Sequence, residues 1–442
     1  MDLIRIVFTL LAMSLLGHLS AQNKHLEKGN KLYQVRKYSA AIPFYEAGIA
    51  ANRNLSALSK LANCYRMNNK FKKASELYEE IVQEERANPR NFYYYGECLL
   101  TLGKYEEAQT WFEIYYDYTK DEKGLMMLAS LKNINNIAPF FDESIEVLPF
   151  AHNSEFDEFA PVLYDGGIVF STDRHIGKLP LKIKNKWTNR EYLKIAYSEQ
   201  LGLIEFREPK SYSTKINAID RNTSNTTFTV DGTTVFYCQN DFQANSKYTY
   251  PLQLYYRKRK RENGSWSSPI KVPFVSAEHN YMHPLIDANG ETLYFVSDKG
   301  NGHGGTDIYV SQRIGEDEWT RPKNLGPNIN TAANEGFPFL FEGRLFFSSK
   351  GHTTLGGFDI FYSELDEKGE WVAPVNLGEP VNSPLDDISI FISKVQKMVL
   401  FTSSRKNESD DIFLFRYTKE LFPEDRLEAQ SNQGNRTKED EK

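Results

Sequence analysis

The fold of this chain is indicated by the stretch NGETLYFVSDKGNGHGGTDIYVSQRIGEDEWTRPKNLG, residues 289–326, whose pattern returns as EGRLFFSSKGHTTLGGFDIFYSELDEKGEWVAPVNLG at residues 342–378. Equivalent residues are 52 positions apart, so that Asp307 corresponds to Asp359 and Trp319 to Trp371. Short aromatic and β-branched runs alternate with glycine-containing turns in both copies. A repeat of this length and composition predicts one four-stranded blade of a β-propeller.

Five segments have the alternating pattern of an inner β-hairpin. In four of them a turn containing Asp-Gly, Asn-Gly or Glu-Gly separates two apolar runs, which is the commonest signature of a tight hairpin. The segments are residues 159–173, 226–241, 283–298, 337–349 and 388–404. The sequence therefore predicts five blades, and a degenerate sixth between Asp173 and Ser224 is the alternative.

Two outer strands are predicted in each blade. The third strand begins with an Asp-Ile pair at Asp307, Asp359 and Asp411. The fourth strand is expected to carry the tryptophan that Trp319 and Trp371 represent in the two best-matched blades.

A loop motif of Leu, Asn and an acidic residue at five-residue intervals connects consecutive blades. It occurs at Leu325, Asn330 and Glu335, at Leu377, Asn382 and Asp387, and once more before the first blade at Leu148, Asn153 and Glu158. After the last third strand, IFLFRY, the chain continues into a polar tail instead of a fourth strand. We therefore expect residues 144–150 to complete the last blade and to close the ring without a free sheet edge.

The N-terminal part contains a different repeat of 33 to 34 residues. Ala41, Ala74 and Ala108 each precede an aromatic residue by four positions and follow another by three. The small residue allows two antiparallel helices to approach closely, and the aromatic residues fill the space between them. This predicts three stacked helix hairpins with a cap helix at 124–136, in a solenoid of residues 22–138 that precedes a propeller of residues 143–418.

The two ends of the chain differ from these domains. Residues 1–21 combine Arg5, a short apolar run and small residues before Ala21, which predicts a secretory signal peptide and a periplasmic location. Residues 419–442 are polar with almost nothing to bury, and we expect them to be disordered.

Charge and cysteine content exclude some functional classes. Lys and Arg number 53 and Asp and Glu 59, so the formal net charge is −6, which argues against a dedicated nucleic-acid-binding protein. Three cysteines, Cys64, Cys98 and Cys238, do not form a disulfide framework. Cys64 and Cys98 hold the same position in neighbouring helical repeats, and we expect these two to be buried thiols.

The blade motif has an inner Pro, a hairpin glycine, Phe-Ser-Ser or Ser-Asp, Gly-Gly-x-Asp-Ile and a late Trp, and it resembles the WD40-like PD40 repeat of TolB-type propellers. The helical repeat resembles the tetratricopeptide repeat. Their order after a signal peptide is similar to that of periplasmic OmpA-family proteins of Bacteroidetes-type bacteria, including the peptidoglycan-binding component of the type IX secretion system. The OmpA-like peptidoglycan-binding domain of those relatives has no counterpart here, so the resemblance does not imply cell-wall binding.

The conspicuous polar residues of the propeller repeat from blade to blade. A catalytic residue should be singular, because one reaction needs one constellation. We therefore interpret the repeated residues as structural, with glycines at positive φ and aspartates that cap the following strand. This set comprises Ser297, Ser348, Ser403, Asp307, Asp359, Asp411 and the glycine pairs 304–305 and 356–357.

Histidines at 279, 283, 303 and 352 suggest a metal site, but they lack ligand spacing and a fixed carboxylate partner, and we expect surface positions for them. No nucleophile elbow, zinc-protease helix or phosphate loop occurs, and the SDKGNG segment lacks the aromatic residue of a sialidase box. We assign no catalytic residue, cofactor or metal.

Two kinds of interaction surface are predicted. The phase of the helical repeat places six residues on the concave face of the solenoid, where they could bind an extended peptide: Asn30, Tyr33, Asn63, Arg66, Tyr93 and Glu97. Two basic runs on the propeller are either a solvated rim, which we favour, or docking sites for an acidic partner: Arg257, Lys258, Arg259, Lys260 and Arg261, and, in an insertion of blade one, Lys182, Lys184 and Lys186.

These features favour a non-enzymatic periplasmic scaffold that binds proteins of an outer-membrane or secretion assembly. The alternative is a carbohydrate- or peptide-processing propeller, TolB-like or sialidase-like, with a site at the central channel.

Overall fold

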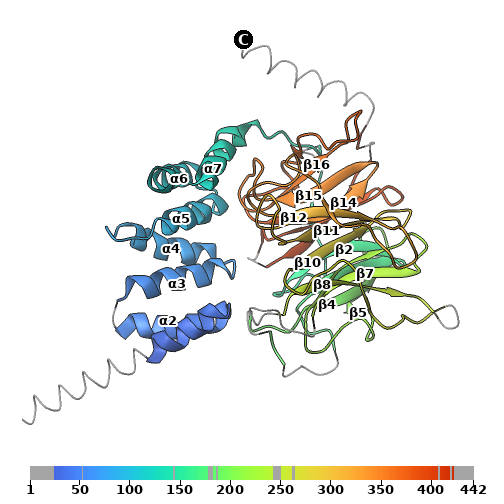
Figure 1. Ribbon diagram of the computed structural model, residues 1–442, viewed down its shortest axis with the longest axis horizontal. Helices are drawn as coiled ribbons and strands as arrows, with labels where there is room; N and C mark the ends of the chain where they lie inside the picture. Colours follow the sequence, from blue (N-terminus) through green and yellow to red (C-terminus); the bar gives the residue numbers. More distant parts are fainter. Residues whose placement is uncertain are drawn as a thin grey trace, which may run out of the picture.

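The computed structural model of the chain describes residues 24–51, 53–142, 145–177, 183–185, 188–241, 250–260, 264–406, 409–418 and 421–422. A helical solenoid lies beside a β-propeller, and the chain passes from one to the other at the end where α7 is located (Figure 1). The predicted signal peptide and most of the predicted tail fall outside the described residues. No helix in the described ranges is long and apolar enough to cross a membrane.

Helices fill the N-terminal domain. The first covers residues 24–34. The others are α2 (Tyr38–Ala51), α3 (Leu55–Arg66), α4 (Phe71–Val82), α5 (Arg90–Thr101), α6 (Tyr105–Thr119) and α7 (Glu122–Asn133), followed by the short η1 (Ile134–Asn136).

Close approach between paired helices follows from the repeated small residues. Ala41, Ala74 and Ala108 are fully buried. A Cβ atom added to Gly96 would lie 2.8 Å from the ring of Phe112, so this position in α5 has room only for hydrogen. The 33-to-34-residue period therefore reflects the repeated close packing of paired helices. The prediction of a helical repeat is confirmed.

Five four-stranded sheets form the propeller, which confirms the predicted five blades. Blade one contains β2 (Glu158–Tyr164), β3 (Gly167–Thr172), β4 (Lys194–Glu199) and β5 (Lys210–Ser211). Blade two contains β6 (Thr223–Phe228), β7 (Thr234–Asn240), β8 (Leu252–Lys258) and β9 (Ile270–Lys271). Blade three contains β10 (Tyr281–Ile286), β11 (Thr292–Ser297), β12 (Asp307–Gln312) and β13 (Lys323–Asn324). Blade four contains β14 (Glu335–Phe341), β15 (Arg344–Ser349), β16 (Asp359–Ser363) and β17 (Val375–Asn376).

The fifth blade takes its outer strand from the other end of the domain. It contains β18 (Asp387–Ser393), β19 (Met398–Ser403), β20 (Asp411–Arg416) and, paired with β20, β1 (Leu148–Pro149). Asn153 accepts from the backbone N–H of Ile412 at 3.0 Å and donates to its carbonyl at 2.8 Å. Asn330 makes the same two bonds to Ile308 within blade three, so the loop motif performs one task in both places.

The tryptophans do not lie in the fourth strands, contrary to the sequence prediction. Trp319 and Trp371 form isolated bridges with Arg313 and Leu365, and β13 and β17 begin only at Lys323 and Val375. Their rings pack on the outer part of the blade core, with the guanidinium of Arg313 5.0 Å from the ring centre of Trp319. The fourth strand is shorter than expected because the tryptophan belongs to the turn before it.

Each innermost strand contains one residue in the left-handed region, with φ between 45° and 53°. The strand pairing shifts register at or beside each of these residues. A non-glycine residue at positive φ costs about 1–2 kcal/mol, so other contacts must hold it. The five residues are Ala160, Asn225, His283, Phe337 and Ser389.

A side chain on the second strand of the preceding blade provides that contact. Ser171 accepts from the backbone N–H of Asn225, and Ser348 from that of Ser389. Thr402 accepts from the N–H of Ala160, and Cys238 occupies the equivalent position in blade two. These bonds run from blade to blade around the ring, including across its closure.

Blade three is the exception, because Val296 occupies the position of the acceptor. The N–H of Phe337 instead donates to Nδ1 of His283 at 3.2 Å, and the two rings stack with centroids 3.7 Å apart. Burial lowers the pKa of His283 to about 3, so the imidazole is neutral and Nδ1 can accept. A histidine thus replaces the missing hydroxyl.

One hydrophobic cluster joins the domain linker to the last described residues. Phe140 lies 5.1 Å from Phe422 between ring centroids, and Leu421 is 9% exposed. The packed chain therefore extends beyond residue 418, where the sequence pattern predicted the propeller to end.

Candidate functional site

Hydrogen bonds connect the predicted groove residues across the helical repeats. Asn63 in α3 donates to the phenol oxygen of Tyr33 in the first helix at 2.7 Å. Arg66 donates to Asn63 at 2.9 Å and to the carboxylate of Glu97 in α5 at 3.0 Å. We call Tyr33, Asn63, Arg66 and Glu97 the polar ladder, because it crosses all three repeats along one face.

The other two predicted groove residues lie beside the ladder. Asn30 accepts from Tyr45 at 3.0 Å and from Lys60 at 2.6 Å, so its oxygen is already occupied. Tyr93 lines the same cavity as Glu97, and burial followed by the Glu97 charge raises its pKa well above the usual value. The structure thus brings Arg66, Tyr93 and Glu97 together and leaves Asn30 in a separate cluster.

Arg66 is the centre of this face. Its guanidinium lies 4.1 Å from the ring centre of Tyr94, and its side chain is 19% exposed. Burial disfavours the charge, but the Glu97 carboxylate and neighbouring groups reverse that effect, and the pKa of Arg66 is raised. The guanidinium is therefore a fixed cation with a planar stacking partner.

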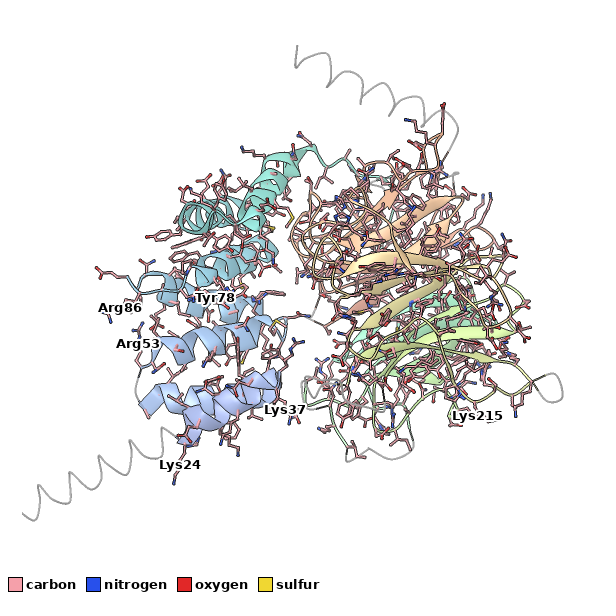
Figure 2. The ribbon with its side chains drawn as sticks, viewed as in Figure 1. Lys24, Lys37, Arg53, Tyr78, Arg86 and Lys215 are labelled. Atoms are coloured by element: carbon pink, nitrogen blue, oxygen red, sulfur yellow. The ribbon has the colours of Figure 1, made fainter. Side chains whose placement is uncertain are left out.

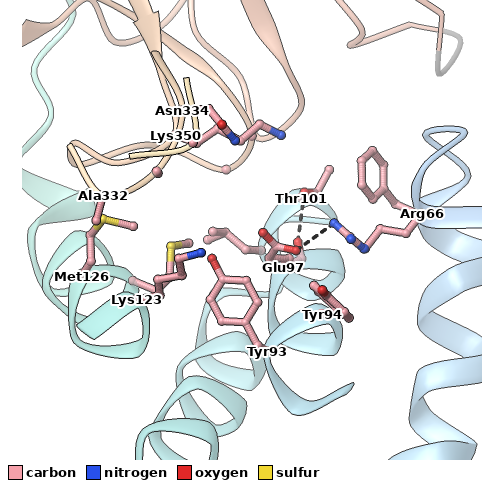
Figure 3. Close-up of a pocket in the computed structure, with 17 residues that line it drawn as sticks. Arg66, Tyr93, Tyr94, Glu97, Thr101, Lys123, Met126, Ala332, Asn334 and Lys350 are labelled. Atoms are coloured by element: carbon pink, nitrogen blue, oxygen red, sulfur yellow. Dashed lines mark hydrogen bonds and ion pairs between the residues drawn. The ribbon is translucent and has the colours of Figure 1, made fainter. Parts of the chain in front are cut away.

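A cavity of about 220 Å³ lies between the solenoid and the propeller, at the end of the polar ladder (Figure 3). The solenoid contributes Arg66, Tyr93 and Glu97, and α7 contributes Lys123, Met126 and Met127. The propeller contributes Asn334, Lys350 and the glycine loops at 305 and 356–357. The concave face is therefore covered by a second wall, which the helical repeat alone does not predict.

Helix α7 is part of this interface. Ser130 accepts from the backbone N–H of Thr354 at 2.9 Å, in the loop before β16. Both residues are buried. The sequence predicted a cap helix, and the structure shows that one side of this helix also packs against blade four.

The repeated glycines and aspartates have structural roles, although not through positive φ as predicted. A Cβ atom on Gly356 would lie 1.8 Å from the carbonyl oxygen of Pro384 in the next interblade loop, so the glycine permits close approach. Asp307 accepts from the backbone N–H groups of His303 and Gly304, and thereby fixes the loop before β12.

The expectation of surface histidines is wrong for two of the four. His283 is packed against Phe337 inside the ring, and Nε2 of His352 bonds to the carbonyl of Ile329 at 3.0 Å. Within the described ranges, His, Cys, Asp and Glu form no group of three that could hold a metal ion.

The basic run of blade two is mostly engaged within the protein. Arg257 is 8% exposed and donates to Tyr237 at 3.0 Å, so it is not available to a partner. Lys258 forms ion pairs with Glu316 and Asp317 at 3.1 and 2.9 Å. Arg259 donates to Tyr164 and lies over the ring of Trp266. Lys260 is exposed, and Arg261 lies outside the described residues.

The insertion of blade one is described only in part. Lys184 is exposed in the connection between β3 and β4, whereas Lys182 and Lys186 lie outside the described residues. Lys260 lies in the connection between β8 and β9. The two connections are at opposite ends of their strands, and the two runs therefore do not form one patch.

Three carboxylates meet where the last blade joins the first. Asp157 accepts from the backbone N–H of Asp410 at 3.4 Å and pairs with Arg190 at 3.0 Å. Arg190 also lies 3.5 Å from Asp173. Burial, together with the charge of Asp157, raises the pKa of both Asp173 and Asp410. This group is singular, but it lines neither the interdomain cavity nor the central channel.

The central channel contains a smaller cavity of about 80 Å³. It is lined by the positive-φ residues and by apolar neighbours such as Val162, Leu285 and Phe391. Three proline residues, Pro161, Pro284 and Pro338, are part of this wall. Nothing in this lining resembles an acid–base pair.

Comparison with known proteins supports the helical repeat. Residues 34–114 match the family model described as anaphase-promoting complex, cyclosome, subunit 3, which identifies a tetratricopeptide-like region over that part of the chain. The match covers α2 to α5 and the first part of α6, and it does not include the propeller.

Solved structures similar to the chain are propellers of low identity. An endo-arabinase from Bacteroides thetaiotaomicron is 13% identical, with 63% of this chain and 99% of that chain covered and a TM-score of 0.38. A β-xylosidase/α-arabinofuranosidase from a compost microbial metagenome is 10% identical, covers 63% and 96%, and has a TM-score of 0.40. An α-L-arabinofuranosidase from Lactobacillus brevis is 12% identical, covers 61% and 91%, and has a TM-score of 0.36. These values carry no argument about activity.

Lys123 and Lys350 of the cavity were not identified from the sequence. A signal was present for Lys350, which follows the second strand of blade four where blades one and three have Asp173 and Asp298. This departure from the repeat distinguishes Lys350 from its structural equivalents. Lys123 has no such signal, because α7 does not belong to the repeat.

Proposed function

We propose that the protein is a non-enzymatic scaffold that binds an extended segment of a partner protein between the solenoid and the propeller. The observation that carries this proposal is the interdomain cavity, which the predicted groove residues Arg66, Tyr93 and Glu97 line from one side. Amide, phenol and guanidinium groups on a solenoid face are suited to hydrogen bonding with an extended backbone.

The cellular setting is proposed from the sequence. The apolar N-terminal segment supports secretion to the periplasm. The resemblance to tetratricopeptide–PD40 proteins of the Bacteroidetes OmpA-family type supports partners in an outer-membrane or secretion assembly. The helical repeat supports protein partners in general, since stacked hairpins present an extended concave surface.

Site-specific crosslinking tests the proposal. A photoreactive amino acid at position 93 should crosslink to a partner in intact cells, and Arg66→Ala should abolish the adduct. The control position is Arg86, which is exposed on the far side of the solenoid (Figure 2). Equal adducts from both positions, or an adduct that Arg66→Ala leaves intact, would refute binding at this face.

The enzymatic alternative is tested with the same purified protein. It predicts hydrolysis of a glycoside or peptide that a single unrepeated carboxylate controls. Asp410 of the closing junction is the candidate, because its equivalents in blades three and four are Thr306 and Phe358. Turnover that Asp410→Asn abolishes would replace the scaffold proposal.

A further inference from the structure

We propose that the interdomain cavity recognises a carboxylate of the bound segment, with an apolar residue next to it. The inference rests on the proposed function and adds the chemical class of the ligand. It depends on the charges that the two walls present and on the side chains that lie between them.

The charged groups of the lining are three cations and one anion. Arg66, Lys123 and Lys350 line the cavity together with Glu97. Glu97 is already paired with Arg66 at 3.0 Å. A positively charged ligand group would therefore meet two ammonium groups and no unpaired carboxylate in the lining.

The two lysines come from different domains. Lys350 pairs with Asp386 at 3.0 Å and lies 4.6 Å from the ring centre of Phe358, so the propeller holds its side chain in place. Lys123 is exposed, and its ammonium forms no close ion pair in the described part of the chain. The nearest carboxylate effect is at Asp121, whose pKa is lowered by the hydrogen bond from Tyr115 and, to a smaller extent, by the Lys123 charge. In Figure 3, Lys350 lies on the propeller wall and Lys123 on the helical wall, and the Glu97–Arg66 pair lies to the right of both. An anionic group that enters here would compensate the charge of Lys123.

The same sign of charge continues along the solenoid next to the cavity. Phe71 lines the cavity at the start of α4, and Lys70 and Lys72 on either side of it are exposed. Neither lysine has an ion-pair partner among the residues that the structure describes. An acidic segment would therefore be attracted to the cavity before it makes contact.

Apolar groups occupy the remaining wall. Met126, Met127, Phe71 and Leu100 line the cavity beside Lys123. Methionine side chains adapt to irregular apolar shapes. The arrangement suits a carboxylate followed or preceded by an apolar side chain, and the carboxylate can come from an Asp or Glu residue or from a chain terminus.

A random peptide library tests the inference with the full-length protein. Each 12-residue peptide is immobilised in two forms, with a free C-terminal carboxylate and with a C-terminal amide. The wild-type protein should enrich peptides that contain an acidic residue beside an apolar one. Enrichment of both forms identifies a side-chain carboxylate, and enrichment of the free-acid form alone identifies a terminus.

Variants separate this inference from the proposed function. Lys123→Gln should weaken binding of the enriched peptides about tenfold and reduce its dependence on salt, and Lys132→Gln, an exposed change further along α7, should leave both unchanged. If the enriched peptides show no preference for acidic residues but Arg66→Ala still releases them, carboxylate recognition is refuted and the scaffold proposal stands. If Arg66→Ala releases no peptides, both are overturned. Binding of acidic peptides that is insensitive to Lys123→Gln would also overturn the inference.

Discussion

Bonds between repeats are made differently in the two domains. In the solenoid, the polar ladder joins a phenol, an amide, a guanidinium and a carboxylate, with no residue type used twice. In the propeller, a hydroxyl at one fixed position binds the next blade in three of five cases. Repetition of a residue type thus accompanies a structural task, whereas a varied set of residues coincides with the cavity.

The largest effect is expected where the ring is closed without a covalent link. Phe150 is 2% exposed and packs against Phe170 and Phe206 of blade one. Phe150→Ala should lower the free energy of unfolding by about 3–5 kcal/mol, because it removes a buried aromatic ring. Chemical denaturation measures this, with Val395→Ala, at a residue 95% exposed, as the control. Equal midpoints for the two variants would contradict closure through this residue.

A change in the polar ladder should have the next largest effect. Arg66→Ala removes two hydrogen bonds and leaves the partly buried Glu97 carboxylate without its partner. We expect a loss of about 2–3 kcal/mol in the solenoid, as for hydrogen bonds to charged groups. Thermal unfolding followed by helical circular dichroism checks this result against Arg86→Ala. A larger effect of Arg86→Ala would show that the ladder does not stabilise the repeats.

The hydroxyl ring offers a reciprocal pair of variants. Ser348→Ala leaves the N–H of Ser389 unpaired in a buried position and should cost about 1–3 kcal/mol. Val296→Ser supplies a hydroxyl where blade three lacks one, and should tolerate a second change, His283→Gln, better than the wild type does. Denaturation of the single and double variants measures the interaction energy between positions 296 and 283. If the two changes in unfolding free energy simply add, the serine and the histidine do not serve the same N–H group.

The histidine of the ring predicts a dependence of stability on pH. Burial lowers the pKa of His283 to about 3, below its ordinary value of about 6.5. Between these values the unfolded chain binds a proton that the folded chain does not. The contribution of His283 is therefore complete above about pH 6.5 and falls as the pH decreases, by up to about 1.4 kcal/mol per pH unit. In His283→Gln this part of the slope between pH 6.5 and 5 should be absent, and an unchanged slope would contradict it.

The smallest effect is expected on the basic run. Lys260→Ala should change the free energy of unfolding by less than about 0.5 kcal/mol, because the side chain is exposed. Arg257→Ala should cost more, since it breaks the bond to Tyr237. Denaturation of both variants side by side distinguishes a docking surface from residues that support the fold. Equal losses of unfolding free energy would favour the docking surface.

Sequence periodicity predicted the fold well because both domains are repeats. Five inner hairpin segments, four of them with a turn glycine, located the blades. The spacing of Leu148, Asn153 and Glu158 predicted a closing strand at 144–150, of which β1 covers Leu148–Pro149. Periodicity could not place Trp319 within the blade, because a residue in a turn recurs at the same 52-residue interval as a residue in a strand. It also could not predict how the two domains pack, since no repeat spans both.

Only the helical side of the candidate site could be predicted from the sequence. Arg66, Tyr93 and Glu97 follow from the phase of the helices, and the structure places all three at one cavity. The positions of Lys123 and Lys350 relative to each other depend on how α7 packs against blade four, where Ser130 and Thr354 form a buried hydrogen bond. Such a contact between residues far apart in the chain has no local signal in the sequence.

The cluster around Phe140 and Phe422 also has a mechanical consequence. Phe422 packs on Phe140 and lies under the guanidinium of Arg344 at 3.8 Å, so the last described residues and the domain linker share one attachment to blade four. A pulling force on the chain beyond Phe422 would load this attachment first.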